Sequence, residues 1–445
     1  MKDLTNGNPL KLMIAFAIPI LIGNLFQQLY NLIDTVIVGQ TLGIGNLAAV
    51  GSTAPIVSLL IGFIFGMNNG FSVIIARFFG ANDQSKMRKA VAGTIVLGFL
   101  NSIVLTGISL LAIRPLLGLL HTPPGVVENA YSFIRIIILG MTFSMMYNMF
   151  SGILRALGDT KSPLYFLIIS TVVNVILDYA FICGLKTGVE GAAVATILSQ
   201  LLSAVLCFIY ILKNYPILRL KKEDFKLDIS LVIELYSTGI SMALMMSVVA
   251  MGTVILQNAI NGFGTNTIAA HTAARKLSEM FMLPLSTLSV TAATFSSQNF
   301  GANKPDRIKT GLKQIILIAW IWATVVVILS YTFVPFIVSG ITGTSQTEVI
   351  RTATRYLRID TPFYYVLGIL LVLRSAMQGV GQKIAPVLAS FIEFFGKIAA
   401  VYYLAPKFGY FGVCITEPII WIACSSFLLI KGLEINRKNN LITDA

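Results

Sequence analysis

Asp34 stands inside a long apolar stretch of the sequence, where an ionisable residue is costly to bury in lipid and is functional by default. Asn24, Gln27 and Asn31 precede it. At about 100° per residue, an α-helix brings these four side chains onto one face. The spacing therefore predicts a polar stripe along a membrane helix, with a carboxylate at one end of it.

A second carboxylate, Asp178, follows Thr171 and Asn174 at the spacing i, i+3, i+7, which again places them on one helix face. Because Asp178 lies near the expected end of its helix, it could instead reach out of the bilayer or form an ion pair. The helix after it carries a third polar stripe, and we expect the three stripes to face one another. The third stripe consists of Thr196, Ser199, Gln200 and Ser203.

Two carboxylates that lie close together in a site of low dielectric constant cannot both ionise easily. A proton or a sodium ion would relieve their repulsion. We therefore predict Asp34 as an acid that couples ion binding to another process, with Asp178 as its partner.

These residues must be positioned by membrane helices. The chain has 445 residues, of which 56% are hydrophobic and 11% charged, and its mean hydropathy is +0.83. About a quarter of the residues in soluble domains are charged. This chain has too few charged residues to cover a surface that faces water, so a soluble protein is excluded. A spanning helix needs roughly 20 apolar residues, and the sequence predicts an all-α integral membrane protein without an extramembrane domain. Twelve spans are expected, starting near Leu10, Leu47, Val91, Val127, Pro163, Gly191, Leu231, Ile268, Ile308, Tyr356, Ala385 and Phe411.

The net charge of +13 follows the positive-inside pattern. The loops at 39–46 and 261–266 carry no Lys or Arg. This alternation predicts a multi-pass protein of the plasma (inner) membrane with both termini in the cytoplasm. It explains the basic charge by topology and anionic-lipid contact, and no nucleic-acid partner is expected. Lys and Arg gather at the N-terminus, at 77–89, 155–161, 213–226 and 304–313, and in the tail.

The sequence contains an internal repeat. The segment FGAN at 79–82 returns at 300–303, an offset of 300 − 79 = 221, and near the fourth span the offset becomes 381 − 158 = 223. Two six-helix halves that both start inside are a parallel repeat. We predict an N-lobe at 1–213, a cytoplasmic linker at 214–229 and a C-lobe at 230–445, related by pseudo-two-fold symmetry around a central cleft. Such an architecture favours an alternating-access carrier.

The repeat provides an internal control for the acidic residues. With the offset of 221, Asp34 corresponds to Ile255, and the second half has no acid at that position. Asn174 and Asp178 correspond in the same way to Phe395 and Ala399. If the acids were scaffold, both halves would need them, so their presence in one half favours function.

Several segments resemble motifs of the multidrug and toxic compound extrusion (MATE) family: DTVIVG at 34–39, LAAVG at 47–51, RALGDTKSP at 155–163, NVILD at 174–178 and GVEGAAVAT at 188–196. The resemblance covers nearly the whole chain and is closer to the archaeal-like branch and the DNA-damage-inducible F type. It implies twelve helices in two lobes with a V-shaped cleft, and efflux of organic cations in exchange for protons or sodium. It also implies a cation or proton site, with Na⁺ as a possible occupant, at Asp34, Asn174, Asp178 and Thr196.

Further residues are candidates for the substrate cleft. Methionine thioethers suit a pocket for varied aromatic cations, although they are equally ordinary lipid-facing or core residues. Glu417 precedes Pro418 and is as well explained by a structural role as by contact with substrate. Pro19 lies inside the first span, where it could act as a hinge or only set a static kink. The cleft candidates are Gln27, Asn31, Tyr147, Asn148, Met246, Gln257 and Glu417.

No P-loop, metal-spaced His/Cys set or nucleophile elbow is present, so no enzyme and no cofactor are expected. Without a nucleotide site, a gradient of H⁺ or Na⁺ must drive transport of small organic cations, by a protein that we expect to be monomeric. Two alternatives on the same fold are a flippase of lipid-linked precursors and an exporter of one specialised metabolite. A membrane-bound enzyme that acts on lipids is disfavoured, because its catalytic residues are missing.

Overall fold

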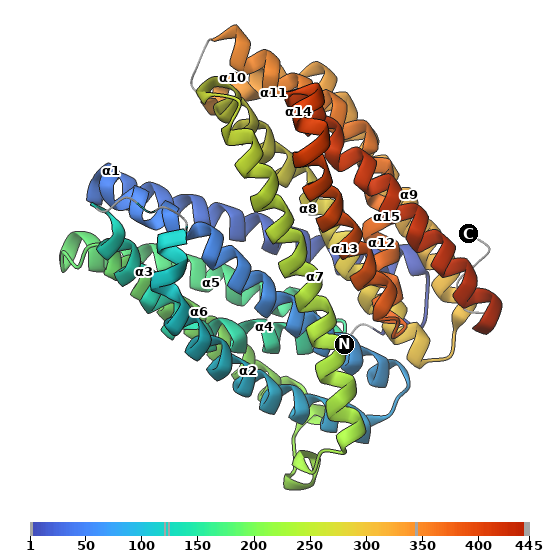
Figure 1. Cartoon of the computed structure of the whole chain (residues 1–445). Helices are drawn as coiled ribbons and strands as arrows, with labels where there is room; N and C mark the ends of the chain where they lie inside the picture. The colour runs from blue at the N-terminus through green and yellow to red at the C-terminus, as the bar shows by residue number, and fades with distance from the viewer. Residues whose placement is uncertain (1–2, 120–121, 123–124, 343–345, 440–445) are drawn as a thin grey trace. The chain divides into compact units, whose positions relative to one another are not determined.

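The computed structural model of the protein describes residues 3–119, 122, 125–342 and 346–439, which are almost entirely helical and contain no strand. Eleven helices in these residues are long and apolar enough to cross a membrane. The bent pair Val127–Leu139 and Met141–Ala156 makes a twelfth when it is counted as one span. The predicted all-helical membrane fold is confirmed (Figure 1).

The first half of the chain opens with two spans in one element, α1 (Pro9–Gly80). Gly43 has a φ of 81° and interrupts the helix between the spans Pro9–Gly43 and Gly45–Gly80. Since Gly lacks a Cβ, it adopts this left-handed conformation without a steric penalty. The remaining helices of this half are α2 (Gln84–Leu119), α3 (Val127–Leu139), α4 (Met141–Ala156), α5 (Lys161–Asp178), the π-helix η1 (Tyr179–Gly184) and α6 (Val189–Asn214).

Two short 3₁₀ helices, η2 (Pro216–Leu218) and η3 (Lys222–Phe225), connect the halves. The predicted linker at 214–229 thus contains little regular structure, as expected of a polar connection. The second half consists of α7 (Ile229–Asn261), α8 (Thr265–Gly301), α9 (Pro305–Thr332), α10 (Val334–Thr342), α11 (Thr347–Asp360), η4 (Thr361–Phe363), α12 (Tyr364–Gly379), α13 (Ile384–Ala399), the π-helix η5 (Ala400–Leu404), α14 (Ala405–Phe408) and α15 (Tyr410–Asn439).

The internal repeat is present in the backbone as well as in the motifs. A π-helix follows the fifth span of each half, at Tyr179–Gly184 and Ala400–Leu404. Residues with left-handed φ also recur at the offsets expected from the sequence. These pairs are Gly43 and Gly264, Asn82 and Asn303, Gly188 and Gly409 at an offset of 221, and Gly158 and Gly381 at 223.

The fourth span of the first half is bent by 44° at Gly140. A side chain at this position would overlap that of Ile197 on α6, so glycine permits α6 to pack closely against the bend. At the corresponding place in the second half, the 3₁₀ turn η4 separates α11 from α12. Both halves therefore interrupt their fourth span, by different local means.

Small residues allow close packing between the second span and α7. A Cβ at Gly66 would lie 2.7 Å from the backbone of Ala243, and one at Gly70 would lie 2.7 Å from Gly239 N. This spacing of small residues is a common basis of helix association in membranes. The buried core on both sides of the contact includes Met67, Phe71, Ile74 and Leu235.

The chain forms two compact units. Unit 1 contains Ile18–Ala243, and unit 2 contains Leu4–Ala17 together with Leu244–Ala445. The division of the sequence at 214–229 into two lobes remains a prediction.

The segment before the first span is held by α8 and α9 within unit 2. Leu4 N donates to Gln298 Oε1 at 3.0 Å, and Asn299 Nδ2 donates to the Leu4 carbonyl at 3.3 Å. Arg307 Nη1 donates to the Gly7 carbonyl at 2.7 Å. Leu4 is completely buried, so this segment is an integral part of unit 2.

Candidate functional site

Two carboxylates from different helices, one partly buried and one fully buried, meet in unit 1. Asp34 of α1 and Asp178, the last residue of α5, lie within hydrogen-bonding distance of each other. In the described part of the chain, no donor serves Asp34 Oδ1 or either oxygen of Asp178. Asp178 is fully buried, which disfavours the alternative that it reaches out to water. The described residues provide no hydrogen-bond donor for these oxygens. A proton or a cation between the two side chains would supply the missing positive charge.

Three polar side chains surround this pair. The Tyr30 hydroxyl donates to Thr196 Oγ1 at 3.1 Å, which joins α1 to α6. Tyr30 also lies close enough to Asp34 and Asp178 to interact with both electrostatically. Asn174, one turn before Asp178, is 1% exposed, and within the described structure neither its Oδ1 nor its Nδ2 has a hydrogen-bond partner. Hard cations prefer such oxygen ligands, so the set suits a proton or Na⁺.

The three helices that carry the predicted polar stripes are in contact. Asp34 and Asp178 join α1 to α5, and Tyr30 and Thr196 join α1 to α6. Ser203 Oγ donates to Ser170 Oγ at 2.5 Å, which joins α6 to α5. The π-helix that begins directly after Asp178 changes the helical period at the acid, and such insertions are frequent at functional sites.

A cavity of about 260 Å³ lies in unit 1, along the stripe of α1. Several predicted residues line it: Pro19, Gln27, Asn31, Tyr147 and Asn148. Pro19 keeps the helical conformation of α1, in which only Gly43 departs from helical dihedral angles. The lining is rich in amides and hydroxyls, to which Asn24, Ser144, Ser151, Thr160 and Gln200 contribute.

The other cleft candidates belong to unit 2 and are not among the described residues that line this cavity. Met246 is exposed, and Gln257 Nε2 donates to Asn261 Oδ1 at 3.1 Å. Glu417 is buried and lies 3.3 Å from Arg275 Nη1 and 3.6 Å from Lys397 Nζ. Because these cations neutralise Glu417 within the protein, the structural interpretation of this residue is favoured over contact with substrate.

The ion pairs around Glu417 continue through a second carboxylate. Lys397 Nζ lies 3.2 Å from Glu393 Oε1, and Arg374 Nη2 lies 3.3 Å from Glu393 Oε2. All five side chains lie within predicted spans. This buried charge network consists of Arg275, Arg374, Glu393, Lys397 and Glu417.

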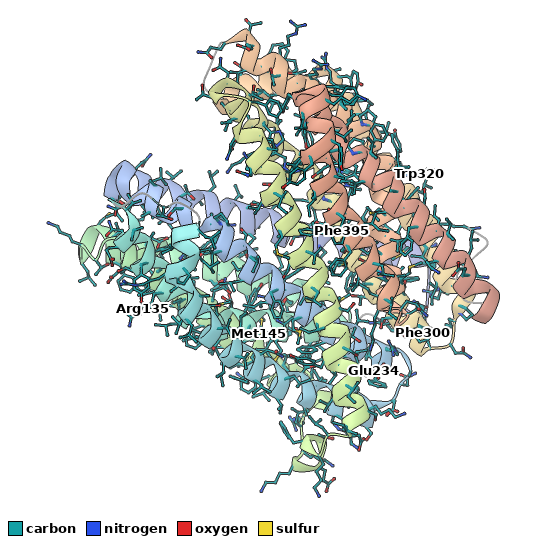
Figure 2. The ribbon with its side chains drawn as sticks, in the orientation of Figure 1. Arg135, Met145, Glu234, Phe300, Trp320 and Phe395 are labelled. Carbon is teal, nitrogen blue, oxygen red and sulfur yellow. The ribbon has the colours of Figure 1, made fainter. Side chains whose placement is uncertain are left out.

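Burial indicates a different counterpart of Asn174 in the second half from the one that the sequence predicts. The offset of 221 pairs Asn174 with Phe395, which is labelled in Figure 2. Phe395 is 61% exposed, whereas Asn174 is buried. The offset of 223 pairs it with Lys397, which is 2% exposed and lies on the buried face of α13. Burial therefore favours Lys397 over Phe395 as the counterpart of Asn174, and the starts of the two helices, Lys161 and Ile384, also differ by 223.

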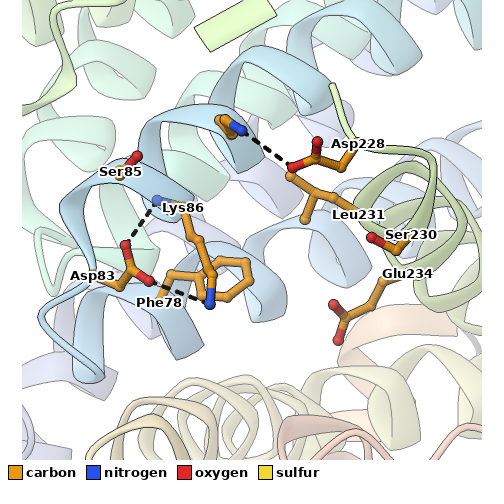
Figure 3. A pocket seen from close by; sticks show the side chains of 9 residues that line it. Phe78, Asp83, Ser85, Lys86, Asp228, Ser230, Leu231 and Glu234 are labelled. Atoms are coloured by element: carbon orange, nitrogen blue, oxygen red, sulfur yellow. Dashed lines mark hydrogen bonds and ion pairs between the residues drawn. The ribbon is translucent and has the colours of Figure 1, made fainter. Parts of the chain in front are cut away.

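A second cavity in unit 1, of about 450 Å³, lies where the end of the second span, the start of α2 and the start of α7 meet (Figure 3). Its charged groups already form ion pairs, between Lys86 and Asp83 at 3.5 Å and between Lys89 and Asp228 at 3.1 Å. Glu234, also in the lining, lies 2.6 Å from Arg77 Nη1. This cavity is therefore a weaker candidate for binding a charged substrate.

Two residues of the site were not among the predicted ones. Tyr30 precedes Asp34 by one helical turn, and this spacing was a usable signal. Arg155 lines the 260 Å³ cavity, although its sequence neighbours indicate a cytoplasmic basic cluster. Arg155 and Lys161 contribute to the same charge pattern, so nothing in the sequence indicates that Arg155 lines a cavity.

Comparison with known proteins agrees with this description. The family model MatE matches two stretches of the chain, residues 19–180 and 241–403. The chain is 29% identical over 427 residues to the "Probable multidrug resistance protein YoeA" of Bacillus subtilis (strain 168), covering 94% of this chain and 91% of that protein. It is 24% identical over 416 residues to the "Probable multidrug resistance protein NorM" of Thermotoga maritima, covering 91% and 87%.

Solved structures show the same fold. An outward-facing multidrug resistance MATE family transporter of the MOP superfamily superposes with a TM-score of 0.87 at 23% identity, covering 96% of this chain and 97% of that one. A MOP superfamily transporter from Pyrococcus furiosus Vc1 (DSM3638) gives the same values. A MATE structure in the bent conformation also has a TM-score of 0.87, at 24% identity, with 96% of each chain covered.

Proposed function

This chain belongs to the MatE family of membrane transporters, which are not enzymes, and from that premise we propose that it exports organic cations by secondary active antiport. Its relatives YoeA and NorM are named for multidrug resistance, which supports drugs as substrates. We place it in the plasma membrane as a monomer with both termini in the cytoplasm, as the loop charges predict.

The observation that carries the proposal is the pair of facing carboxylates, Asp34 and Asp178, which within the described structure has neither a cation nor a hydrogen-bond donor of its own. A proton or Na⁺ bound there would neutralise the pair. The Asn174 and Thr196 oxygens would complete the site. Because Asn31 lies on the same helix face as Asp34 and lines the cavity, neutralising the acid would alter the polarity of the path to the substrate.

The position of these acids also supports the proposed branch, the archaeal-like and DNA-damage-inducible F type. The resemblance places that branch's ion site in the first half, on Asp34, Asn174, Asp178 and Thr196. In the second half, Gln378 stands in α12 where a sodium-coupled branch is expected to have an acid.

One unit of pH difference supplies about 1.4 kcal/mol, so a one-for-one exchange of a proton for a monovalent cation supports a concentration ratio of about ten. A sodium gradient would serve in the same way.

The test is efflux of ethidium from proteoliposomes, with either a pH gradient or a sodium gradient imposed on the wild type and on Asp34→Asn. We expect one gradient to drive efflux in the wild type and neither to drive it in the variant. The effective gradient identifies the coupling ion. Efflux by Asp34→Asn at the wild-type rate would overturn the assignment of the site, and a wild type that moves no cation would overturn the substrate class.

A further inference from the structure

The 450 Å³ cavity of unit 1 lies beside the turn between the second and third spans. Unit 2 contains the equivalent turn, because Asn82 and Asn303 both have left-handed φ at the offset of 221. In unit 2 the segment Leu4–Gly7 covers the surface beside this turn. Lys304 Nζ donates to one backbone carbonyl of the segment at 2.8 Å, and Arg307 Nη1 donates to another at 2.7 Å. The repeat thus provides two equivalent surfaces, and in unit 2 the chain covers its own.

The equivalent surface in unit 1 is not covered in the same way. Residues 225–228, just before α7, correspond to Leu4–Gly7 at the offset of 221. Their Asp228 lies 3.1 Å from Lys89 Nζ. Lys86, the counterpart of Arg307, instead forms an ion pair with Asp83 at 3.5 Å. The cavity therefore lies in unit 1 where unit 2 holds a peptide segment.

The lining of this cavity carries charges of both signs (Figure 3). Its carboxylates are those of Asp83, Asp228 and Glu234, and its ammonium groups are those of Lys86 and Lys89. The two ion pairs among them are partly exposed, and pairs of this kind contribute little to stability. A ligand with a single charge would leave one partner of a pair unpaired, whereas a ligand with both charges satisfies both partners.

The surroundings of the cavity are those of a lipid head group. The cavity is bounded by the first turns of α2 and α7, at the polar ends of two spans, where membrane helices meet the head-group region. On α7, Ile229 and Ile233 are 74% and 59% exposed. These two residues are one turn apart and lie directly beside the lining residues Ser230 and Glu234 on the helix surface. An apolar stripe thus leads away from a cavity lined by charges.

We propose that this cavity binds the head group of phosphatidylethanolamine, a phospholipid that carries a phosphate and a primary ammonium. Lys86 and Lys89 bind the phosphate, and Asp83 and Asp228 accept hydrogen bonds from the ammonium. The acyl chains follow the exposed stripe of α7. Phosphatidylcholine lacks the N–H donors, and phosphatidylglycerol lacks the cation, so neither satisfies both sets of groups. The site is separate from the Asp34 pair and from the 260 Å³ cavity, and it goes beyond the proposed function.

The test is native mass spectrometry of the full-length, delipidated protein with dioleoyl forms of these three lipids. We expect the wild type to bind phosphatidylethanolamine about 10-fold more tightly than the other two. Asp83→Asn should reduce this preference by about 3- to 10-fold, and the amide can still cap α2, where Lys86 N donates to Asp83 Oδ1 at 2.9 Å. Asp306→Asn, which changes an exposed carboxylate at the start of α9, is the matched control and should leave the preference unchanged.

A second variant, Ser230→Trp, fills the cavity without removing a charge and should weaken the binding of phosphatidylethanolamine alone. A wild type without preference would overturn the proposal, as would an equal loss for all three lipids in Asp83→Asn or a preference retained in Ser230→Trp. Glycerophosphoethanolamine has the head group without acyl chains, and competition as strong as that of the lipid would overturn the assignment to a lipid. Binding is measured without a gradient, so these outcomes are independent of ethidium efflux.

Discussion

The two halves of the repeat surround their pairs of acidic residues with different groups. In the first half, Asp34 and Asp178 face each other, and the described structure contains no counter-cation beside them. In the second half, Glu393 and Glu417 are neutralised by cations of the same unit. Burying a charge is costly unless it is paired. Acids that are paired within their own half, such as Glu393 and Glu417, are explained as scaffold, whereas two facing acids without a cation depend on an ion from outside. Asp360 is the exception in the second half, because it is completely buried and no described Lys or Arg forms an ion pair with it.

The largest effect should follow from removing the acid that has no counterpart in the second half. We expect Asp34→Asn to abolish gradient-driven efflux, a loss of at least about 100-fold, because a neutral amide leaves nothing to titrate. Thermal unfolding of the purified variant should show a native or higher midpoint, since the repulsion within the pair is gone. A variant that unfolds early would show that Asp34 also supports the fold.

The next variant gives the first half the cation of the second. We expect Asn174→Lys to place an ammonium beside Asp34 and Asp178, as Lys397 stands beside Glu393, and to reduce efflux by about 10- to 100-fold, because the bound ion is replaced by a permanent one. Asn174→Gln, which keeps a neutral amide, is the control. If the gradient drives efflux by Asn174→Lys at the wild-type rate, the acids of the first half do not need an external ion, and the difference between the halves has no role in coupling.

Breaking the buried charge network should affect stability more than transport. Glu393→Gln leaves Arg374 without its carboxylate and Lys397 with Glu417 alone, which should cost about 3–5 kcal/mol in the free energy of unfolding. Unfolding of the purified protein in sodium dodecyl sulfate measures this cost. The control is Glu348→Gln, because Glu348 is exposed on the same unit and lies outside the network. Efflux per folded molecule should stay within about twofold of the wild type, and loss of ion coupling would contradict a purely structural network.

The smallest effect is expected at Tyr30. Tyr30→Phe removes one hydrogen bond, the 3.1 Å contact with Thr196, which is worth about 0.5–1.5 kcal/mol. The concentration of coupling ion that gives half-maximal efflux should rise by about 2- to 12-fold, with the maximal rate preserved. A change as large as that of Asp34→Asn would give the tyrosine a direct part in proton transfer.

Much of the fold could be predicted from the sequence, because the bilayer imposes both the length and the apolar character of each span. The polar stripes were predicted for the same reason, since a period of 3.6 fixes which residues share a face. The interruption at Gly140 was not predicted, because it depends on the approach of Ile197 from α6. The unshifted offset of 221 paired Asn174 with Phe395, and only burial indicated Lys397, at the shifted offset of 223, as its counterpart.

The ion pairs between distant residues of the second half were not predicted. Arg275 and Glu417 are 142 residues apart, and nothing in their local sequence indicates that they meet. Arg155 was assigned to a basic cluster by its sequence neighbours, whereas the fold places it in the lining of the cavity. The easiest part of the site to predict was the set of four polar residues near Tyr30, because two helical periodicities and a family motif indicated it. These residues are Asp34, Asn174, Asp178 and Thr196.

The amino-terminal segment has a consequence for dividing this protein into two polypeptides. A gene fragment that begins at α7 would encode most of unit 2 but would lack Leu4–Gly7. The backbone carbonyls of this segment accept hydrogen bonds from Asn299 and Arg307. Such a fragment should be incomplete by itself and should recover when the first 17 residues are supplied on a separate chain. In a split-protein complementation experiment, the short amino-terminal peptide would therefore act as a third, indispensable component.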